Sequence, residues 1–256
     1  MVTVEQQLPS GEIGRPRPRF EDLRLITGHG RFVEDVALPG LLHLALVRSP
    51  YPHARITRID TTAASVATGV RAVVTGADVP VLANLPATPV SPNLRVPPFE
   101  LLCRTVVRAV GMPVAAVVAT SRAAAADAAQ LVEVDYEPLP AVAEAEAALA
   151  PDAPVLYPEF GSNVCYTLEA GHGDVEAAFA GAAHVTRLRV TFPRLAPVPL
   201  EPRGVVASYD PTSQELTIWA TTQSPHRVRW LASLALGMPE PRIRVLAPDM
   251  GGGFGG

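Results

Sequence analysis

The sequence predicts an α+β fold in which short strands alternate with short helices and a glycine-rich loop follows the last strand. Three observations support this class. An apolar run is followed by an alanine-rich stretch and a second strand pattern at 114–136, a β-branched hairpin pattern occupies 204–221, and a last apolar run at 242–247 leads into five glycines and one phenylalanine. At 256 residues, the chain is long enough for one or two domains with their own cores.

The first half of the chain alternates strand patterns with short helical ones. We expect strands at 41–49, 54–60, 70–75, 114–119 and 131–136, short helices at 61–68 and 122–130, and a loop over the proline-rich residues 80–100. Ser121 is suited to cap the second of these helices. A strand–helix–strand unit usually gives neighbouring parallel strands, so strands 114–119 and 131–136 are expected to pair in parallel.

Proline content and polarity divide the chain into four parts. We predict a flexible arm at 1–15, a first domain at 16–140, a linker with several prolines at 141–170 and a second domain at 171–256. Within the second domain a helix is expected at 174–180 and a strand at 184–192. The arginines of that strand, Arg187 and Arg189, would lie on its solvated face.

The last fifty residues form a unit with a possible ligand site. A strand at 204–209, a turn at 210–213 and a returning strand at 215–221 precede Gln223. Ser224 and Pro225 suit the start of a helix that ends at Gly237, and the strand 242–247 then opens into the glycines. The glutamine amide, the helix N-terminus and a loop without Cβ atoms could converge on one anionic cofactor. Taken singly, Gln223 is typical of a solvated loop residue, and the glycines of a flexible tail.

Several motifs appear in an order that resembles the molybdenum-binding subunit of the xanthine dehydrogenase/aldehyde oxidase family, especially the bacterial large chains of the carbon-monoxide-dehydrogenase type. The motifs of the second half are Leu200-Glu201-Pro202-Arg203-Gly204, Thr221-Thr222-Gln223-Ser224-Pro225-His226 and Pro248-Asp249-Met250-Gly251-Gly252-Gly253-Phe254-Gly255-Gly256. Upstream motifs, such as Gly28–Asp35 and Val47–Ile56, are similar to the family's α/β hammerhead domain, and Gly173–Phe179 is similar to the entry of its molybdopterin-binding domain. The resemblance covers nearly the whole chain from about residue 15.

The resemblance implies a molybdenum–molybdopterin cofactor, as such or as the cytosine dinucleotide. Gln223 would hydrogen-bond an oxo ligand, and the backbone of Gly252, Gly253, Phe254 and Gly255 would lie against the metal and its pterin. Gln223 and Phe254 would therefore be near molybdenum without being its ligands. The implied reaction is hydroxylation of an aldehyde, an N-heterocycle or carbon monoxide with water-derived oxygen. The implied partners are an iron–sulfur small subunit with 2Fe–2S clusters, an FAD-binding medium subunit and the remaining molybdopterin-binding portion, in a bacterial cytoplasm.

The sequence departs from the family pattern in two places. Met112 stands where relatives tend to carry an acidic residue, and the family continues after Gly256 into a lysine and a long region that holds the general base, a glutamate. We therefore assign no catalytic residue to this chain and expect it to be an N-terminal portion that is inactive alone. The alternatives are a non-catalytic fragment or interaction module that contributes half a cofactor site, and an unrelated anion-binding protein.

Composition excludes several other classes. The net charge of −4 gives no basic footprint for nucleic acid, no apolar run approaches the ~18 residues of a membrane span, and the N-terminus does not resemble a secretion signal. The absence of lysine excludes a Schiff base or a P-loop lysine. Cys103 and Cys165 are too few for an iron–sulfur cluster and suit buried apolar positions. Glu201, close to Arg203 in an apolar stretch, is expected to form a structural ion pair; the alternative is a residue that lines the cofactor pocket.

Overall fold

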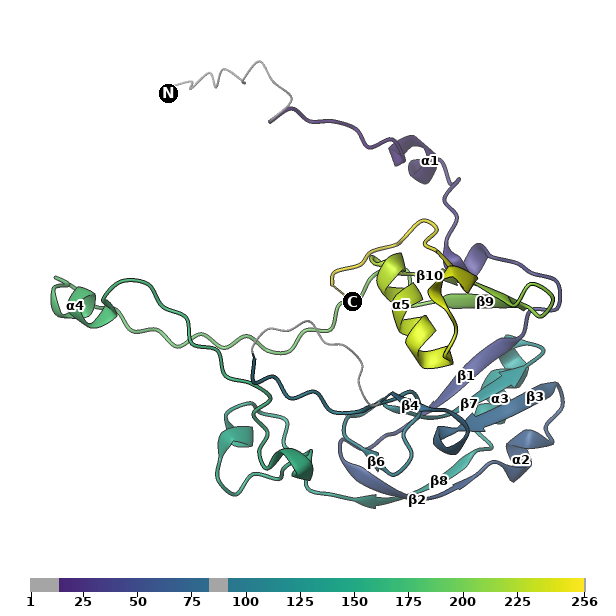
Figure 1. Cartoon of the computed structure of the whole chain (residues 1–256), viewed down its shortest axis with the longest axis horizontal. Helices are drawn as coiled ribbons and strands as arrows, with labels where there is room; N and C mark the ends of the chain where they lie inside the picture. The colour runs from purple at the N-terminus through teal and green to yellow at the C-terminus, as the bar shows by residue number, and fades with distance from the viewer. Residues whose placement is uncertain (1–13, 83–91, 256) are drawn as a thin grey trace. The chain divides into compact units, whose positions relative to one another are not determined.

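The computed structural model describes residues 14–82 and 92–255, and the structural statements below concern these residues. The chain divides into two compact units (Figure 1). The first unit comprises Met1–Val36, Ala196–Arg229 and Glu240–Gly256, and the second comprises Ala37–Leu195 and Trp230–Pro239. The first unit therefore joins segments from both ends of the sequence. The domain limits 16–140 and 171–256 remain a prediction.

The second unit is built on two three-stranded antiparallel sheets. One has the order β1 (His43–Arg48), β7 (Pro113–Ala119), β3 (Val70–Thr75), and the other the order β6 (Val106–Val107), β2 (Ala54–Asp60), β8 (Glu133–Pro138). A two-stranded sheet pairs β4 (Val81–Leu82) with β5 (Phe99–Glu100). Helix α2 (Thr62–Ser65) packs on β3, η2 (Gly76–Asp78) follows β3, and α3 (Arg122–Ala129) packs on β1 and β7.

The expected parallel pairing of strands 114–119 and 131–136 is wrong. β7 already has β1 on one edge and β3 on the other, both antiparallel, so neither edge of β7 is available. β8 pairs instead with β2 in the other sheet, again antiparallel. Helix α3 thus connects two different sheets. The strand–helix–strand pattern in the sequence does not indicate which strand edges remain free to pair.

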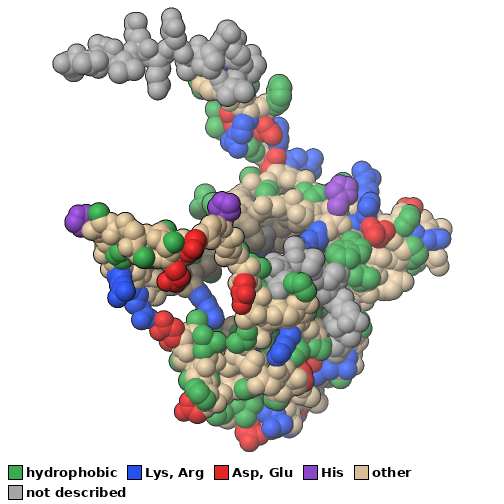
Figure 2. Space-filling view, turned by 60° about the vertical axis from the view of Figure 1, so that its left-hand side comes forward, with side chains coloured by type: hydrophobic (Ala, Val, Ile, Leu, Met, Phe, Trp, Pro, Cys, Tyr) green, Lys and Arg blue, Asp and Glu red, His purple; other side chains and the backbone are tan. Residues whose placement is uncertain are grey.

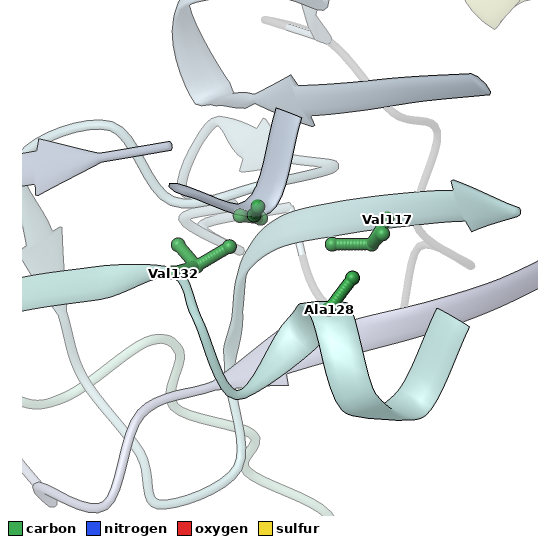
Figure 3. Close-up of a cluster of buried hydrophobic side chains, with 5 residues drawn as sticks. Val117, Ala128 and Val132 are labelled. Carbon is green, nitrogen blue, oxygen red and sulfur yellow. The ribbon is translucent and has the colours of Figure 1, made fainter. Parts of the chain in front are cut away.

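The core of the second unit lies where α3 meets β7. Val117 of β7, Ala128 of α3 and Val132, just before β8, point toward one another (Figure 3) and are buried together with Ala64 and Ala115. The small alanines let the helix approach the sheet closely. Ser121 caps α3 as expected, with its Oγ accepting a hydrogen bond from the Ala124 N–H at 3.1 Å.

The two cysteines have different environments. Cys103 is buried in a second cluster with Ala54, Val107 and Val114, and burial raises the pKa of its thiol to about 11. It is therefore an inert apolar side chain, as predicted. Cys165 is exposed, so the same prediction is wrong for this residue.

Residues 139–199 contain little regular structure. The structure has η3 (Ala147–Leu149), η4 (Pro158–Phe160) and α4 (Val175–Ala180), the last capped by the carboxylate of Asp174. The predicted strand at 184–192 is wrong: this segment has no strand pairing within the described part of the chain. Its apolar side chains stay exposed, with Leu188 at 83% and Phe192 at 87%. Figure 2 shows apolar side chains at many places on the face in view.

The first unit contains a three-stranded sheet with the order β11 (Ile243–Leu246), β10 (Glu215–Ala220), β9 (Val205–Asp210). β9 and β10 form the predicted antiparallel hairpin, and β10 pairs with β11 in parallel. Helix α5 (Pro225–Leu236) connects these two parallel strands, and η5 (Glu240–Arg242) precedes β11. α5 ends as predicted at Gly237, whose φ is 62°, with the Met238 N–H donating to the Ser233 carbonyl at 3.2 Å.

Two short elements near the N-terminus were not expected from the sequence. They are α1 (Asp22–Ile26) and η1 (Val33–Asp35). Val33 is buried, and a Cβ added to Gly204 would come within 3.2 Å of its Cγ1. The absence of a side chain at Gly204 therefore lets the start of β9 lie against η1. No helix among the described residues has the length and apolarity needed to cross a membrane.

Candidate functional site

The glycine loop that follows β11 begins at Asp249, which is held by the N-terminal segment. Both carboxylate oxygens of Asp249 accept hydrogen bonds from the Arg24 guanidinium, in which Nη2 lies 2.6 Å from Oδ1. The Arg31 N–H donates to Oδ2 at 2.7 Å, and the Asp249 N–H donates to the Arg31 carbonyl at 2.9 Å. The entry of the loop is thus attached to residues more than 200 positions earlier in the sequence.

These contacts hold the pKa of Asp249 at about 2, below the ordinary 3.8, first through the Arg24 side chain and then through the Arg31 N–H. Because the folded-state pKa is depressed, the contacts stabilise the fold above about pH 4. That contribution is lost as the pH falls from about 4 to about 2.

Arg24→Ala is expected to raise the pKa of Asp249 toward 3.8, because the larger of the two favourable contacts is removed. A ¹³C NMR titration of the side-chain carboxyl of Asp249 measures this directly. Arg71→Ala, at an exposed position of β3, is the matched control and should leave the midpoint unchanged. An Asp249 midpoint that stays near 2 in Arg24→Ala would contradict the assignment.

Two residues further on, the loop lies against Glu201. The Gly251 N–H donates to Glu201 Oε2 at 2.8 Å. A Cβ added to Gly251 would come within 2.4 Å of the Glu201 Cβ and 3.0 Å of its backbone nitrogen. Only glycine therefore allows the two backbones to approach this closely.

Gln223 and Gly253 are brought together, as the hypothesis of convergence requires. A Cβ on Gly253 would lie 2.0 Å from Nε2 of Gln223 and 2.3 Å from its Cδ. The amide of Gln223 is exposed and has no hydrogen-bond partner among the residues that the structure describes. The side chain is thus positioned over the loop with its donors free for a ligand.

The other predicted site residues, Gly252, Phe254 and Gly255, have different environments. A Cβ on Gly252, whose φ is 126°, would meet the Phe254 ring at 2.7 Å and the Pro199 Cβ at 3.0 Å. Phe254 itself has a φ of 47°, which is unusual for a residue with a side chain, and is 76% exposed. Gly255 has a φ of 82° and faces open space. The structure therefore brings Gln223, Gly252 and Gly253 into one cradle, with the phenylalanine ring over the loop.

The chemistry of this cradle suits a large anionic cofactor better than a bare metal ion. It offers an amide donor and, at Gly255, backbone that faces open space. Helix α5 begins two residues after Gln223, and its N-terminus favours negative charge nearby. Among the described residues, no group of three histidines, cysteines or acidic residues could hold a metal ion.

Some residues of the site were missed or misread in the sequence. Glu201 does not pair with Arg203, so the expected ion pair is wrong; the carboxylate contacts Val33, Thr221 and Gly251 instead. The pairing of Asp249 with Arg24 was not predicted at all. Neither contact has a local signal, because the partners lie between 20 and 225 positions apart.

Two family models match the chain and together account for most of it. The model for the hammerhead domain of aldehyde oxidase and xanthine dehydrogenase matches residues 27–140, and the model for the molybdopterin cofactor-binding domain matches residues 156–256. The chain belongs to the aldehyde oxidase and xanthine dehydrogenase family. The glycine loop, Gln223 and Glu201 all fall within the range matched by the molybdopterin-binding model.

Relatives in this family act on chemically different substrates. The chain is 43% identical to the nicotine 6-hydroxylase large subunit of Paenarthrobacter nicotinovorans and 42% identical to the carbon monoxide dehydrogenase large chain of Afipia carboxidovorans, in each case over 95% of this chain. Among solved structures, quinoline 2-oxidoreductase from Pseudomonas putida 86 matches 93% of the chain with a TM-score of 0.85 and 41% identity. The chain spans about 30% of the length of each of these relatives.

Proposed function

We propose that this chain is part of the molybdenum-binding subunit of a molybdenum hydroxylase. The observation that carries the proposal is the position of the free Gln223 amide over Gly253, in a loop within the range matched by the molybdopterin-binding model. Because the amide and the glycine backbone are in contact, a ligand beside them would meet both on the same side.

Each residue of the cradle has a defined role in this proposal. Gln223 donates a hydrogen bond from Nε2 and so orients an oxygen atom of the cofactor. The backbone of Gly252–Gly255 lies against the cofactor, and the Phe254 ring covers one side of the loop. The bound molybdenum–molybdopterin, as such or as its cytosine dinucleotide, supplies the two-electron redox chemistry.

The substrate in this proposal is an N-heterocycle, an aldehyde or carbon monoxide. The relatives named for nicotine and quinoline favour an N-heterocycle as the substrate. The similarity to a carbon monoxide dehydrogenase large chain keeps carbon monoxide as an alternative substrate. Electrons would leave through 2Fe–2S clusters on a small subunit to FAD on a medium subunit. The general base would come from the remaining molybdopterin-binding portion, so we expect the chain alone to be inactive.

Metal analysis is the first test of this function. The chain is purified alone and after co-production with the small subunit, the medium subunit and the remaining molybdopterin-binding portion. Stoichiometric molybdenum only after co-production supports the proposal. A folded chain without molybdenum in either preparation contradicts the proposal. The chain would then be interpreted as a non-catalytic module.

Gln223→Ala is expected to lower kcat of the co-produced complex on the order of 100-fold, because one hydrogen-bond donor to the cofactor is removed. Steady-state kinetics at equal molybdenum content measure the effect. Gln130→Ala, at an exposed position after α3, is the matched control and should leave turnover unchanged. Unchanged turnover in Gln223→Ala would remove this residue from the site.

A further inference from the structure

Glu201 joins three separate segments of the first unit through one carboxylate. Its Oε1 accepts hydrogen bonds from the Val33 N–H at 3.3 Å and from Thr221 Oγ1 at 3.1 Å, and its Oε2 accepts one from the Gly251 N–H at 2.8 Å. The donors belong to η1, to the residue after β10 and to the glycine loop. An ionised carboxylate suits this position because it only accepts, and because hydrogen bonds to a charged acceptor are roughly twice as strong as neutral ones.

Two of these contacts lie close to the cradle in the sequence. Thr221 precedes Gln223 by two positions, and Gly251 precedes Gly253 by two positions. The Thr221 backbone is itself fixed, since its N–H donates to the Gly204 carbonyl at 3.1 Å. One carboxylate therefore connects the segment that carries the amide donor to the segment that carries the glycine backbone.

The close approach at Gly251 makes this connection rigid. Because a Cβ there would overlap the Glu201 Cβ and lie 3.0 Å from its backbone nitrogen, the loop lies directly on the base of the Glu201 side chain and not merely within reach of its carboxylate. The carboxylate is half-buried, which limits competition from water for the same donors.

We infer that Glu201 is a positioning residue, which sets the placement of the Gln223 amide relative to the Gly253 backbone. It acts through Thr221 and Gly251 and takes no part in proton transfer. The inference depends on the proposed function only in that the cradle faces a cofactor; the geometric effect itself is measurable in the chain without one.

Glu201→Gln tests the inference by NMR on the full chain. The substitution replaces one acceptor oxygen with an amide that donates, so a contact to Gly251 or to the Thr221–Val33 pair is lost. We expect roughly tenfold faster hydrogen exchange at the Gly251 amide or at the Val33 amide, whichever loses its acceptor. We also expect a weaker nuclear Overhauser effect between the Gln223 side-chain amide and the Gly253 α protons. Amides of the β1–β7 pairs should not change.

Two further variants make the test decisive. Glu215→Gln, at an exposed position of β10 in the same unit, makes the same chemical change and should alter neither signal. If Glu201→Gln does not fold, Thr221→Val decides, because it removes only the hydroxyl donor and should weaken the same Gln223–Gly253 signal.

A purely structural role predicts a different result. Glu201→Gln would then lower the unfolding midpoint while the Gln223–Gly253 signal stayed as in the native chain, and that outcome overturns the inference. Failure of the molybdenum test would refute the proposed function without affecting these measurements. The two ideas can therefore fail separately.

Discussion

Gly253→Ala is expected to reduce turnover of the co-produced complex on the order of 100-fold while leaving the chain folded. The new Cβ would lie 2.0 Å from Gln223 Nε2 and 2.3 Å from its Cδ, so the glutamine side chain has to move. Because the obstructing atoms are the end of a flexible, exposed side chain, the movement costs little folding energy. We expect the free energy of unfolding to change by no more than about 0.5 kcal/mol.

The measurement is kcat together with molybdenum content, with a urea titration of the chain alone. Gly171→Ala is the matched control, because a Cβ there meets nothing within 4 Å. The double variant Gly253→Ala/Gln223→Ala separates the causes: if both changes act through the glutamine, their effects on the activation free energy will not add. Additive effects, or full activity in Gly253→Ala, would show that the Gln223 side chain has no role over the loop.

Gly251→Ala is expected to destabilise the first unit by about 1–3 kcal/mol. Its Cβ would lie 2.4 Å from the Glu201 Cβ and 3.0 Å from the Glu201 nitrogen. These atoms are fixed to the main chain and cannot rotate away as a side-chain end can. Either the glycine loop or the backbone at Glu201 therefore has to shift. The hydrogen bond from the Gly251 N–H to Glu201 would be weakened by the same shift.

Urea unfolding followed by tryptophan fluorescence can report on this unit. Trp219 lies on β10 within it, and Trp230→Phe as the background removes the other tryptophan signal. Gly171→Ala in the same background is the control. A Gly251→Ala midpoint equal to that of the control would show that the loop does not lie on Glu201.

The two glycine variants are informative as a pair because they differ by only two positions. One should affect turnover without stability, and the other should affect stability first. The difference follows from what each Cβ would meet: a movable side chain at Gly253, and at Gly251 the Glu201 Cβ and backbone nitrogen, which move only with the main chain. Equal effects on stability would contradict this description of the loop.

Local sequence signals were sufficient for most elements. The alternation of 215–220 and the turn at 210–213 predicted the hairpin, and Pro225 and Gly237 predicted the limits of α5. Ser121 predicted the cap of α3. In each case the information lies within a few residues, because turns, caps and period-two patterns depend on neighbouring backbone and side chains.

The errors have one common physical origin, the choice of distant partners. The parallel pairing of β7 with β8 failed because β1 and β3 occupy both edges of β7. The strand expected at 184–192 has the right alternation, but a strand also needs a neighbour to accept its hydrogen bonds. The Glu201–Arg203 pair failed because backbone donors from distant segments take the carboxylate.

The sequence by itself determined the α+β class, most of the strands and helices, the family, and the residues Gln223 and Gly252–Gly255 as the candidate site. Only the tertiary structure decided which strands pair beyond the β9–β10 hairpin, that Arg24 and Arg31 hold Asp249, and that Glu201 connects Thr221 to Gly251. The reason is that preferences for turns, helix caps and strand patterns depend on residues that are adjacent in the sequence. Contacts over 20 to 225 positions depend on which edges, donors and acceptors remain free once the rest of the chain has folded.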